Sequence, residues 1–482
     1  MATLFLSSSL MLLILDSIFV TSLASSSAAS VKTYFPGISQ SSLNNGARQN
    51  LKPRRIPSYK THYFPQNLDH FTFQPNSYKI FYQKYLINSK FWHRGAPIFV
   101  YTGNEGDIDW FAANTGFLID IAPKFHALLV FIEHRFYGES MPFGKHSYKS
   151  AETLGYLNSQ QALADFAVLI RSLKHNLSSE ASPVVVFGGS YGGTACLVLL
   201  VLAAWFRLKY PHVAIGALVS SAPILQFDAV VPWSSFYDAV SKDFKDVSLN
   251  CYHVIKGSWA ELEAISKKGL PELSRDFRAC KKLGSIYSAR DWLWDAFVYT
   301  AMMNYPTESN FMKPLPAYPV KEIIDKSSSE ATKLSRVFAA ASLYYNHSQA
   351  EKCFEIENET DDHGLHGWNW QACTEMVMPM TVSNKSMFPP SPFSYKDFAD
   401  DCKKNYGATP REHWITTEFG GTSVLKNISA SIVALVAEKG AHHTDLRPAT
   451  EDDPDWLIEH RKQEVEIIKK WISDYYFDTK QS

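Results

Sequence analysis

Apolar and polar residues alternate from about residue 60 in the pattern of a mostly parallel sheet covered by helices. Short β-branched or apolar runs predict strands, and the longer stretches between them repeat their apolar residues at helical spacing. The helical stretch 159–177 lies between two such strands and therefore predicts a βαβ crossover. The strongest strand candidates are 97–101, 127–132, 183–187 and 214–219.

The pattern changes after about residue 233, where a helical, Trp-rich and Lys/Glu-rich sequence without clear strands begins. It runs to about residue 400, which predicts a second, mainly helical domain inserted into the first. Sheet-like sequence returns at 431–437, and 455–476 has the pattern of a closing amphipathic helix. We therefore expect one sheet-based domain formed by 58–232 and 401–482, with a helical cap at 233–400.

The first 57 residues read as segments that precede the folded part. Residues 4–20 are nearly all apolar and are followed by small residues, which predicts a secretory signal peptide at 1–25. A membrane anchor is the alternative, but Asp16 interrupts the apolar run, which is shorter than the roughly 20 residues that span a bilayer. Residues 26–57 are mostly polar and indicate a propeptide or a loose arm.

The composition indicates a folded globular protein and gives no sign of a highly charged partner. The 482 residues suffice for two or three domains, and 46% hydrophobic with 20% charged residues is typical of a folded globular protein. Lys plus Arg number 47 and Asp plus Glu 48, so the net charge of −1 gives no electrostatic case for binding nucleic acid or an anionic membrane. Five glycosylation sequons fit the secretory route, at Asn176, Asn346, Asn358, Asn384 and Asn427.

The sharpest motif is GGSYGG at 188–193, directly after a strand candidate and before a helix-compatible run. This strand, turn and helix predict the nucleophile elbow of an α/β-hydrolase, in which Ser190 sits on a tight turn between glycines. The Tyr191 amide then stabilises an oxyanion, and a second donor is expected from the loop at 102–108, which contains Gly103. A chance occurrence of G-x-S-x-G is the alternative, which the flanking elements disfavour.

A serine nucleophile needs a base, and in this fold the histidine comes last in chain order. The segment KGAHHTD at 439–445 follows the final strand candidate and supplies His442 and His443. A surface loop and a metal site are the alternatives, but an adjacent pair in such a loop is expected to point its rings apart, which disfavours chelation. His363 and His366 also have ligand-like spacing, and their Gly- and Trp-flanked setting favours a structural loop.

A set of motifs carries a family resemblance: YTGNEGDI at 101–108, EHRFYGES at 133–140, GGSYGG at 188–193, SSAPI at 220–224, WNWQACTEMVMP at 368–379, HWITTEFGG at 413–421 and GAHHTDLR at 440–447. Together they resemble the lysosomal Pro-X carboxypeptidase family, with its dipeptidyl-peptidase relatives, and look most like the plant members. The resemblance implies an α/β-hydrolase domain, an inserted helical cap and a serine mechanism. By motif position Ser190 matches the nucleophile and His442 the base, with His443 and Arg447 close by.

The resemblance breaks at the third member of the catalytic triad. In the family an Asp lies in an Asn-Gly-x-x-Asp-Pro-Trp loop after a strand, but here Gly421 continues directly into TSVLK at 422–426, so that strand and its loop are missing. The remaining acids before His442, Glu418 and Glu438, do not fit the role, and we name no catalytic acid. Loss of the acid in triad enzymes costs about 10⁴ in turnover.

Two more features bear on the site. Residues 194–201 replace a single Met that follows the nucleophile glycines in the family, and Met378 matches a Met of the proline pocket, with an ordinary core role as its alternative. An alternatively spliced or mis-assembled family member is our hypothesis for these departures. The resemblance implies two disulfides, one between Cys280 and Cys353 and one between Cys373 and Cys402.

These observations favour a serine exopeptidase of the Pro-X carboxypeptidase type, in which Ser190 forms an acyl-enzyme with peptides that carry proline near a terminus. Dipeptidyl-peptidase action, a catalytically inactive glycoprotein of the same fold and an esterase are the alternatives. The resemblance implies neither a metal nor an organic cofactor. The compartment, whether vacuole, lysosome or extracellular space, and a homodimeric state are both left open.

Overall fold

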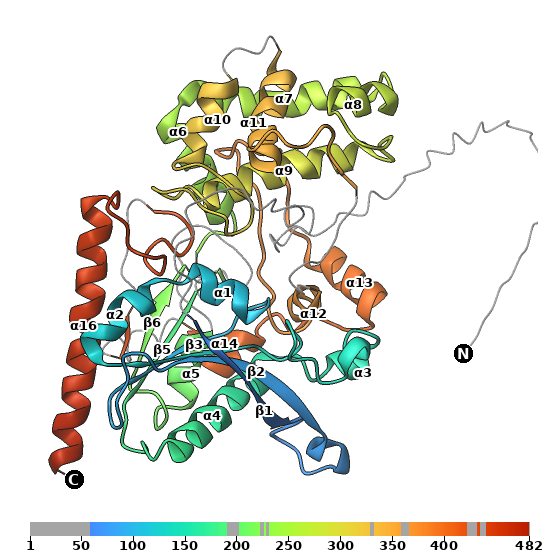
Figure 1. Cartoon of the computed structure of the whole chain (residues 1–482). Coiled ribbons are helices and arrows are strands. Elements are labelled where there is room, and N and C mark those ends of the chain that lie inside the picture. The colour runs from blue at the N-terminus through green and yellow to red at the C-terminus, as the bar shows by residue number, and fades with distance from the viewer. Residues whose placement is uncertain are drawn as a thin grey trace, which may run out of the picture. The chain divides into compact units, whose positions relative to one another are not determined.

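The computed structural model describes residues 58–481, apart from 190–201, 222–225, 228–230, 328–331, 358–365, 422–430 and 434–439. The strands of the described residues form one seven-stranded sheet in the order β1-β2-β4-β3-β5-β6-β7 (Figure 1). Pairing is antiparallel between β1 and β2 and between β2 and β4, and parallel elsewhere. The strands are β1 (Lys60–Asn67), β2 (Ile80–Asn88), β3 (Ile98–Thr102), β4 (Leu128–Ile132), β5 (Val184–Gly189), β6 (Gly216–Ser220) and β7 (Ile432–Val433).

The central strands form where the sequence is apolar on both faces. Every residue of β3, β4, β5 and β6 is buried, as expected for parallel strands that are covered on both sides. The four strongest strand predictions are confirmed, each to within two residues at either end. The α/β-hydrolase fold class is thus confirmed by a mainly parallel sheet with helices around it.

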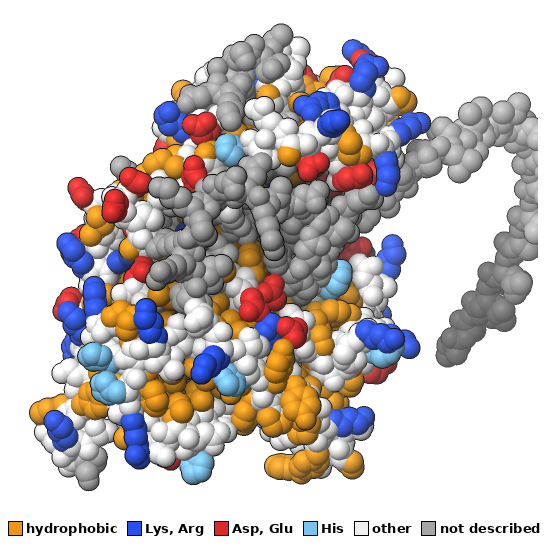
Figure 2. Space-filling model, in the orientation of Figure 1, with side chains coloured by type: hydrophobic (Ala, Val, Ile, Leu, Met, Phe, Trp, Pro, Cys, Tyr) orange, Lys and Arg blue, Asp and Glu red, His pale blue; other side chains and the backbone are white. Residues whose placement is uncertain are grey.

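The edge pair β1 and β2 was missing from the prediction, because β2 buries polar residues on both of its faces. Gln83 is fully buried and Lys84 nearly so, and the Gln66 side chain donates a hydrogen bond to the Gln83 side chain at 2.8 Å. No continuous apolar run marks such a strand. Figure 2 shows hydrophobic side chains gathered on the surface around this pair, where Phe73 is 87% exposed and Tyr82 is 65% exposed.

Helices cover the sheet, with α1 and α2 above it and α4 and α5 below it in the view of Figure 1. The predicted crossover helix is confirmed as α4, which begins after Asn158, whose side chain accepts a hydrogen bond from the Gln161 N–H. The predicted closing helix is confirmed as α16 and packs against β6. The bounds are α1 (Ile108–Asn114), α2 (Phe117–Phe125), α3 (Ala151–Leu154), α4 (Ser159–Asn176), α5 (Leu202–Lys209), α14 (Trp414–Phe419) and α16 (Asp455–Gln481), with 3-10 helices at Pro75–Tyr78 and Gly144–His146.

A separate group of helices follows β6 and contains no β-strand among its described residues. These helices pack on one another, with α9 and α11 in contact with most of the others (Figure 1). Trp292 and Trp294 of α9 are buried, so the Trp-rich composition supplies the core of this group. The helices are α6 (Ser235–Val247), α7 (Leu249–Ser266), α8 (Leu270–Asp276), α9 (Ile286–Met302), α10 (Pro319–Ser327) and α11 (Lys333–Asn346).

Two later helices, α12 (Gly367–Ala372) and α13 (Tyr395–Tyr406), contact the loops of the sheet domain. The Trp370 side chain of α12 donates a hydrogen bond to the Leu157 carbonyl at 3.2 Å. Among the described residues no helix combines the length and apolarity needed to cross a membrane. The predicted signal peptide and propeptide lie outside the part of the chain that the structure describes. Both predicted disulfides are present, Cys280 with Cys353 and Cys373 with Cys402.

Candidate active site

The candidate nucleophile follows directly on β5. This strand ends at Gly189, and Ser190 and Tyr191 come next in the chain, although both lie outside the described residues. β5 lies between β3 and β6, and the carboxyl ends of these three parallel strands meet at one edge of the sheet. Ligands of parallel α/β sheets bind at this edge, so the described residues around Gly189 define the candidate site.

The loop after β3 contacts the end of β5 through Asn104, whose side-chain amide donates a hydrogen bond to the Gly189 carbonyl. Gly103, predicted as an oxyanion donor, donates its N–H to the Ile132 carbonyl at 2.8 Å. A Cβ on Gly103 would lie 2.2 Å from that oxygen, so the glycine is needed for the close approach of two strand ends. The Gly103 amide is therefore engaged within the fold. The sequence analysis did not single out Asn104, although a polar residue directly after a buried strand is a signal for this edge.

The two histidines of the last motif are fixed from two sides through their backbone. The His442 N–H donates to the carbonyl of Met302, the last residue of α9, at 2.8 Å. The His443 N–H donates to the hydroxyl of Ser221, directly after β6, at 3.1 Å. His443 also has a positive φ of 55°, which non-glycine residues seldom adopt, and this turn keeps both rings inside the protein.

The imidazole rings of His442 and His443 are stacked, with their centroids 3.9 Å apart and their planes 25° apart. The expectation that the two rings point apart was therefore wrong, because the left-handed backbone at His443 turns its ring back over that of its neighbour. The His443 ring faces the end of β5, since a Cβ on Gly189 would lie 2.5 Å from its Nε2 atom. The pair thus lies against the residue that precedes Ser190.

Burial sets the charge of this pair. His442 is 3% exposed, and burial lowers the pKa of its imidazole to about 3. The pKa of His443 is also well below its ordinary value, first through burial and then through the charges of His442 and Arg447. The Arg447 guanidinium lies over the Tyr305 ring, 4.2 Å from its centroid. Both imidazoles are therefore neutral in moderately acidic solution.

No carboxylate of the described residues contacts either ring. The Nδ1 atom of His442 and the Nε2 atom of His443 are buried and have no hydrogen-bond partner there. Asp445 is the acid closest along the chain, but its carboxylate accepts a hydrogen bond from the Ser220 hydroxyl and lies beside His460 and Glu464. The described part of the site thus contains a base without an acid to orient it.

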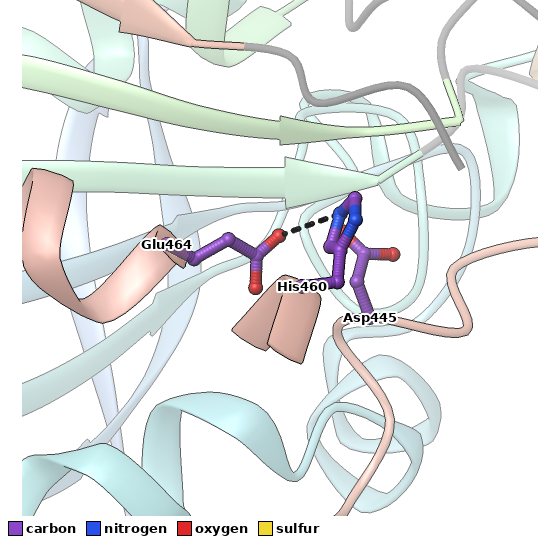
Figure 3. Close-up of side chains that lie close together, drawn as sticks. All are labelled: Asp445, His460 and Glu464. Atoms are coloured by element: carbon purple, nitrogen blue, oxygen red, sulfur yellow. Dashed lines mark ion pairs between the residues drawn. The ribbon is translucent and has the colours of Figure 1, made fainter. Parts of the chain in front are cut away.

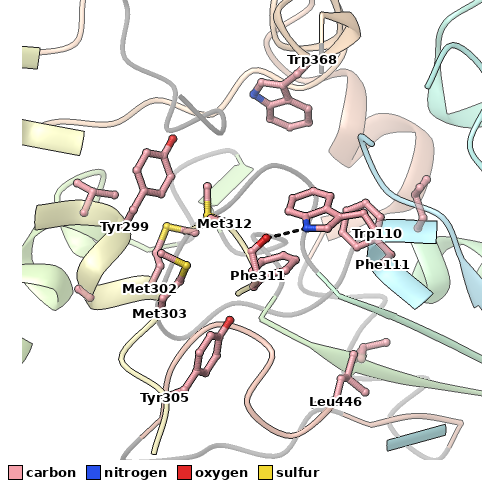
Figure 4. Packing of buried hydrophobic residues seen from close by; sticks show 14 of the residues in the cluster. Trp110, Phe111, Tyr299, Met302, Met303, Tyr305, Phe311, Met312, Trp368 and Leu446 are labelled. Atoms are coloured by element: carbon pink, nitrogen blue, oxygen red, sulfur yellow. Dashed lines mark hydrogen bonds between the residues drawn. The ribbon is translucent and has the colours of Figure 1, made fainter. Parts of the chain in front are cut away.

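An apolar wall borders the histidine pair. The Phe311 ring lies 6.3 Å from the His443 ring and is stacked on the Trp110 ring, with 4.7 Å between centroids. The Trp110 indole N–H donates to the Phe311 carbonyl at 2.7 Å (Figure 4). Met378 is 2% exposed and belongs to the same hydrophobic core. Sequence reasoning missed Trp110 and Phe311, because they come from different elements about 200 residues apart and no spacing links them.

Two predicted glycosylation sites are exposed, and the other described residues of the prediction have contacts of their own. The Asn176 and Asn384 sequons are exposed, whereas Asn346 is half-buried and its side-chain amide donates to the Glu351 carbonyl at 2.8 Å. The His366 ring makes an edge contact with the Tyr148 ring. Outside the described residues lie Asn358, Asn427 and His363, together with the acid Glu438.

Known proteins are similar to this chain over most of its length. A family model described as serine carboxypeptidase S28 matches residues 66–425. The human lysosomal Pro-X carboxypeptidase is 41% identical over 457 residues, which cover 88% of this chain and 90% of that protein. The prolyl carboxy peptidase like protein 5 of Caenorhabditis elegans is 34% identical and covers 89% of this chain and 93% of its own length. Among solved structures, an acetylester hydrolase from Corynebacterium glutamicum matches 86% of this chain and 97% of its own at 10% identity, with a TM-score of 0.37.

Proposed function

The chain belongs to the serine carboxypeptidase S28 family, and we propose that it removes the C-terminal residue that follows a proline in a peptide. The serine peptidase class comes from the family itself, and the preference for proline is carried over from relatives named for it. The observation that carries the proposal is the buried, stacked pair of His442 and His443 against Gly189, one residue before Ser190.

In the proposed mechanism the Ser190 hydroxyl attacks the carbonyl carbon of the scissile bond, and the imidazole of His442 takes its proton. The same imidazole then returns the proton to the leaving amine, which leaves an acyl-enzyme on Ser190 for water to hydrolyse. The Tyr191 amide and the 102–108 loop stabilise the oxyanion, and Gly103 contributes only if its N–H leaves the Ile132 carbonyl. His443 supports the base from the side of β5, and the charge of Arg447 helps to keep His443 neutral.

The buried base suits an acidic compartment. A solvent-exposed histidine is mostly protonated below pH 6.5 and cannot take a proton, but burial keeps His442 neutral there. We propose that the chain enters the secretory route through residues 1–25, carries glycans, and works in a vacuole or lysosome, as the names of its relatives suggest. Met378, with the wall of Trp110 and Phe311, is the proposed apolar boundary for the proline ring.

A catalytically inactive protein of the same fold is the second candidate. It is favoured by one observation, the lack of any described carboxylate in contact with the His442 or His443 ring. The helices between residues 235 and 346 form the proposed cap in either case, because they pack on one another after β6.

One assay separates the candidates. Purified protein is incubated at acid pH with a blocked Pro-Phe substrate, a dipeptidyl-Pro substrate and a simple ester, each beside Ser190→Ala. Release of Phe from the first substrate above the rate of the variant supports the carboxypeptidase. Release from the second alone supports dipeptidyl-peptidase action. Equal rates for protein and variant on all three substrates leave only the inactive protein.

A further inference from the structure

A second group of titratable side chains lies at the other end of the histidine-bearing loop. Asp445 comes from this loop, and His460 and Glu464 come from successive turns of α16, on the same side of the helix (Figure 3). The His460 Nε2 atom lies 3.5 Å from a carboxylate oxygen of Glu464. One ligand-type atom from each of the three residues lies within 4.8 Å of the other two.

These three atoms are spaced for a small divalent cation. Tetrahedral Zn²⁺ bonds nitrogen and oxygen ligands at about 2.0–2.2 Å, so its ligand atoms lie about 3.4 Å from one another. The pair of His460 and Glu464 already has this spacing, and the Asp445 oxygen lies within 4.8 Å of both. One imidazole with two carboxylates suits Zn²⁺, whereas Mg²⁺ and Ca²⁺ prefer six or more oxygen ligands.

The burial of Glu464 is the independent observation that points to a ligand. Its side chain is 2% exposed, and its Oε2 atom has no hydrogen-bond partner among the described residues. Among the residues that the structure describes, no Lys or Arg forms an ion pair with Glu464 or Asp445. A buried carboxylate whose second oxygen has no hydrogen-bond partner is costly, and a bound metal ion would remove that cost.

The surroundings hold the three residues in place. The Ser220 hydroxyl donates a hydrogen bond to the Asp445 carboxylate, the kind of outer contact that orients a metal ligand. The Arg461 guanidinium donates to the Asp453 carboxylate and to the Asp445 and Thr444 carbonyls. Arg461 thus ties the loop to α16 without neutralising the carboxylates of the cluster.

We propose that Asp445, His460 and Glu464 bind one Zn²⁺ ion and that this site fastens the histidine-bearing loop to α16. A water molecule completes the four ligands. The site is distinct from the stacked pair of His442 and His443, neither of which belongs to the cluster. It does not depend on the proposed peptidase activity, because all its ligands lie outside the candidate catalytic residues.

Titration calorimetry on the full-length chain, first stripped with a chelator, tests the proposal with ZnCl₂ as the titrant. One equivalent should bind, and His460→Ala and Glu464→Gln should each weaken it by at least about tenfold. The matched control is His175→Ala, which removes an exposed histidine that lies 3.2 Å from Glu180 in a similar pair. Binding that is absent, or that is equally strong in all four proteins, would overturn the proposal and leave a proton as the only occupant of the cluster.

Two further measurements distinguish loss of Zn²⁺ binding from misfolding of the variants and from loss of peptidase activity. Co²⁺ in place of Zn²⁺ should give visible absorption bands of a tetrahedral site in the parent protein, and Glu464→Gln, which nearly preserves shape, should abolish them. Repeating the titration in Ser190→Ala should give the parent affinity, since this substitution removes activity and leaves the cluster intact. Loss of Zn²⁺ binding in Ser190→Ala would contradict the separation of the two sites.

Discussion

The two histidine clusters at either end of residues 442–464 differ in their acidic partners. His442 and His443 are stacked on each other with no described carboxylate in contact, and burial lowers the pKa of both. His460 lies beside Glu464 and Asp445, and its pKa is raised first by the hydrogen bond to Glu464 and then by the charges of both acids. The first cluster is neutral in moderately acidic solution and has no described acid beside it, whereas the second places two acids beside one histidine. The difference shows that burial alone keeps a histidine neutral, but only an acid can orient it and stabilise its protonated form.

The largest expected effect follows from the missing acid. Against a blocked Pro-Phe substrate at acid pH, kcat/KM of this chain should be lower than that of the human Pro-X carboxypeptidase by about 10⁴, the cost of removing the acid from a triad. Both proteins are assayed side by side, with the Ser190→Ala rate subtracted. Equal values would mean that an acid outside the described residues reaches the histidine pair.

Removing the base should lower the remaining catalytic activity further. His442→Ala is expected to lower the residual kcat/KM by about 10²-fold or more, because general base catalysis contributes that much. His175→Ala serves as the control, since its side chain is 82% exposed. If His442→Ala and the parent protein have the same residual rate, His442 is not the general base.

A side chain at the end of β5 should lower the stability of the fold. Gly189→Ala places a Cβ 2.5 Å from the His443 Nε2 atom, so the ring must move, and the free energy of unfolding should fall by about 1–3 kcal/mol. Gly284→Ala is the control, because its Cβ would meet only ordinary contacts of 3.6 Å or more. Urea unfolding measures both. Equal stability of the two variants would show that His443 does not pack against Gly189.

The depressed pKa of His442 makes the stability of the fold depend on pH. Below about pH 6.5 the unfolded chain binds a proton at this residue while the folded protein, with a pKa of about 3, does not. The stability tied to His442 is therefore complete above pH 6.5 and falls by about 1.4 kcal/mol for each pH unit below it. Comparing urea unfolding of the parent and of His442→Gln between pH 7 and pH 4 tests this, and parallel curves would contradict it.

The sequence predicted the parts of the fold that depend on continuous patterns. β3 to β6 and α4 were evident because their apolar residues recur at one fixed spacing. β2 was not, because it buries polar residues on both faces, Gln83 on one and Lys84 on the other.

For the site, the motifs identified Ser190 and His442, but they did not indicate the stacking of the rings. That stacking depends on the positive φ of His443. A positive φ is expected from a sequence mainly at glycine, so the histidine gave no sign of it. The contact of Trp110 with Phe311 and the approach of Asp445 to α16 depend on tertiary structure alone.

The central claim is that Ser190 and the imidazole pair form one reactive site, and labelling with a phosphonate that reacts only with activated serines tests it most directly. The account predicts that mass spectrometry finds the label on Ser190 and that His442→Ala slows the labelling by at least about tenfold, with His175→Ala unchanged. Absence of label on Ser190, or a labelling rate that is indifferent to His442, would contradict it.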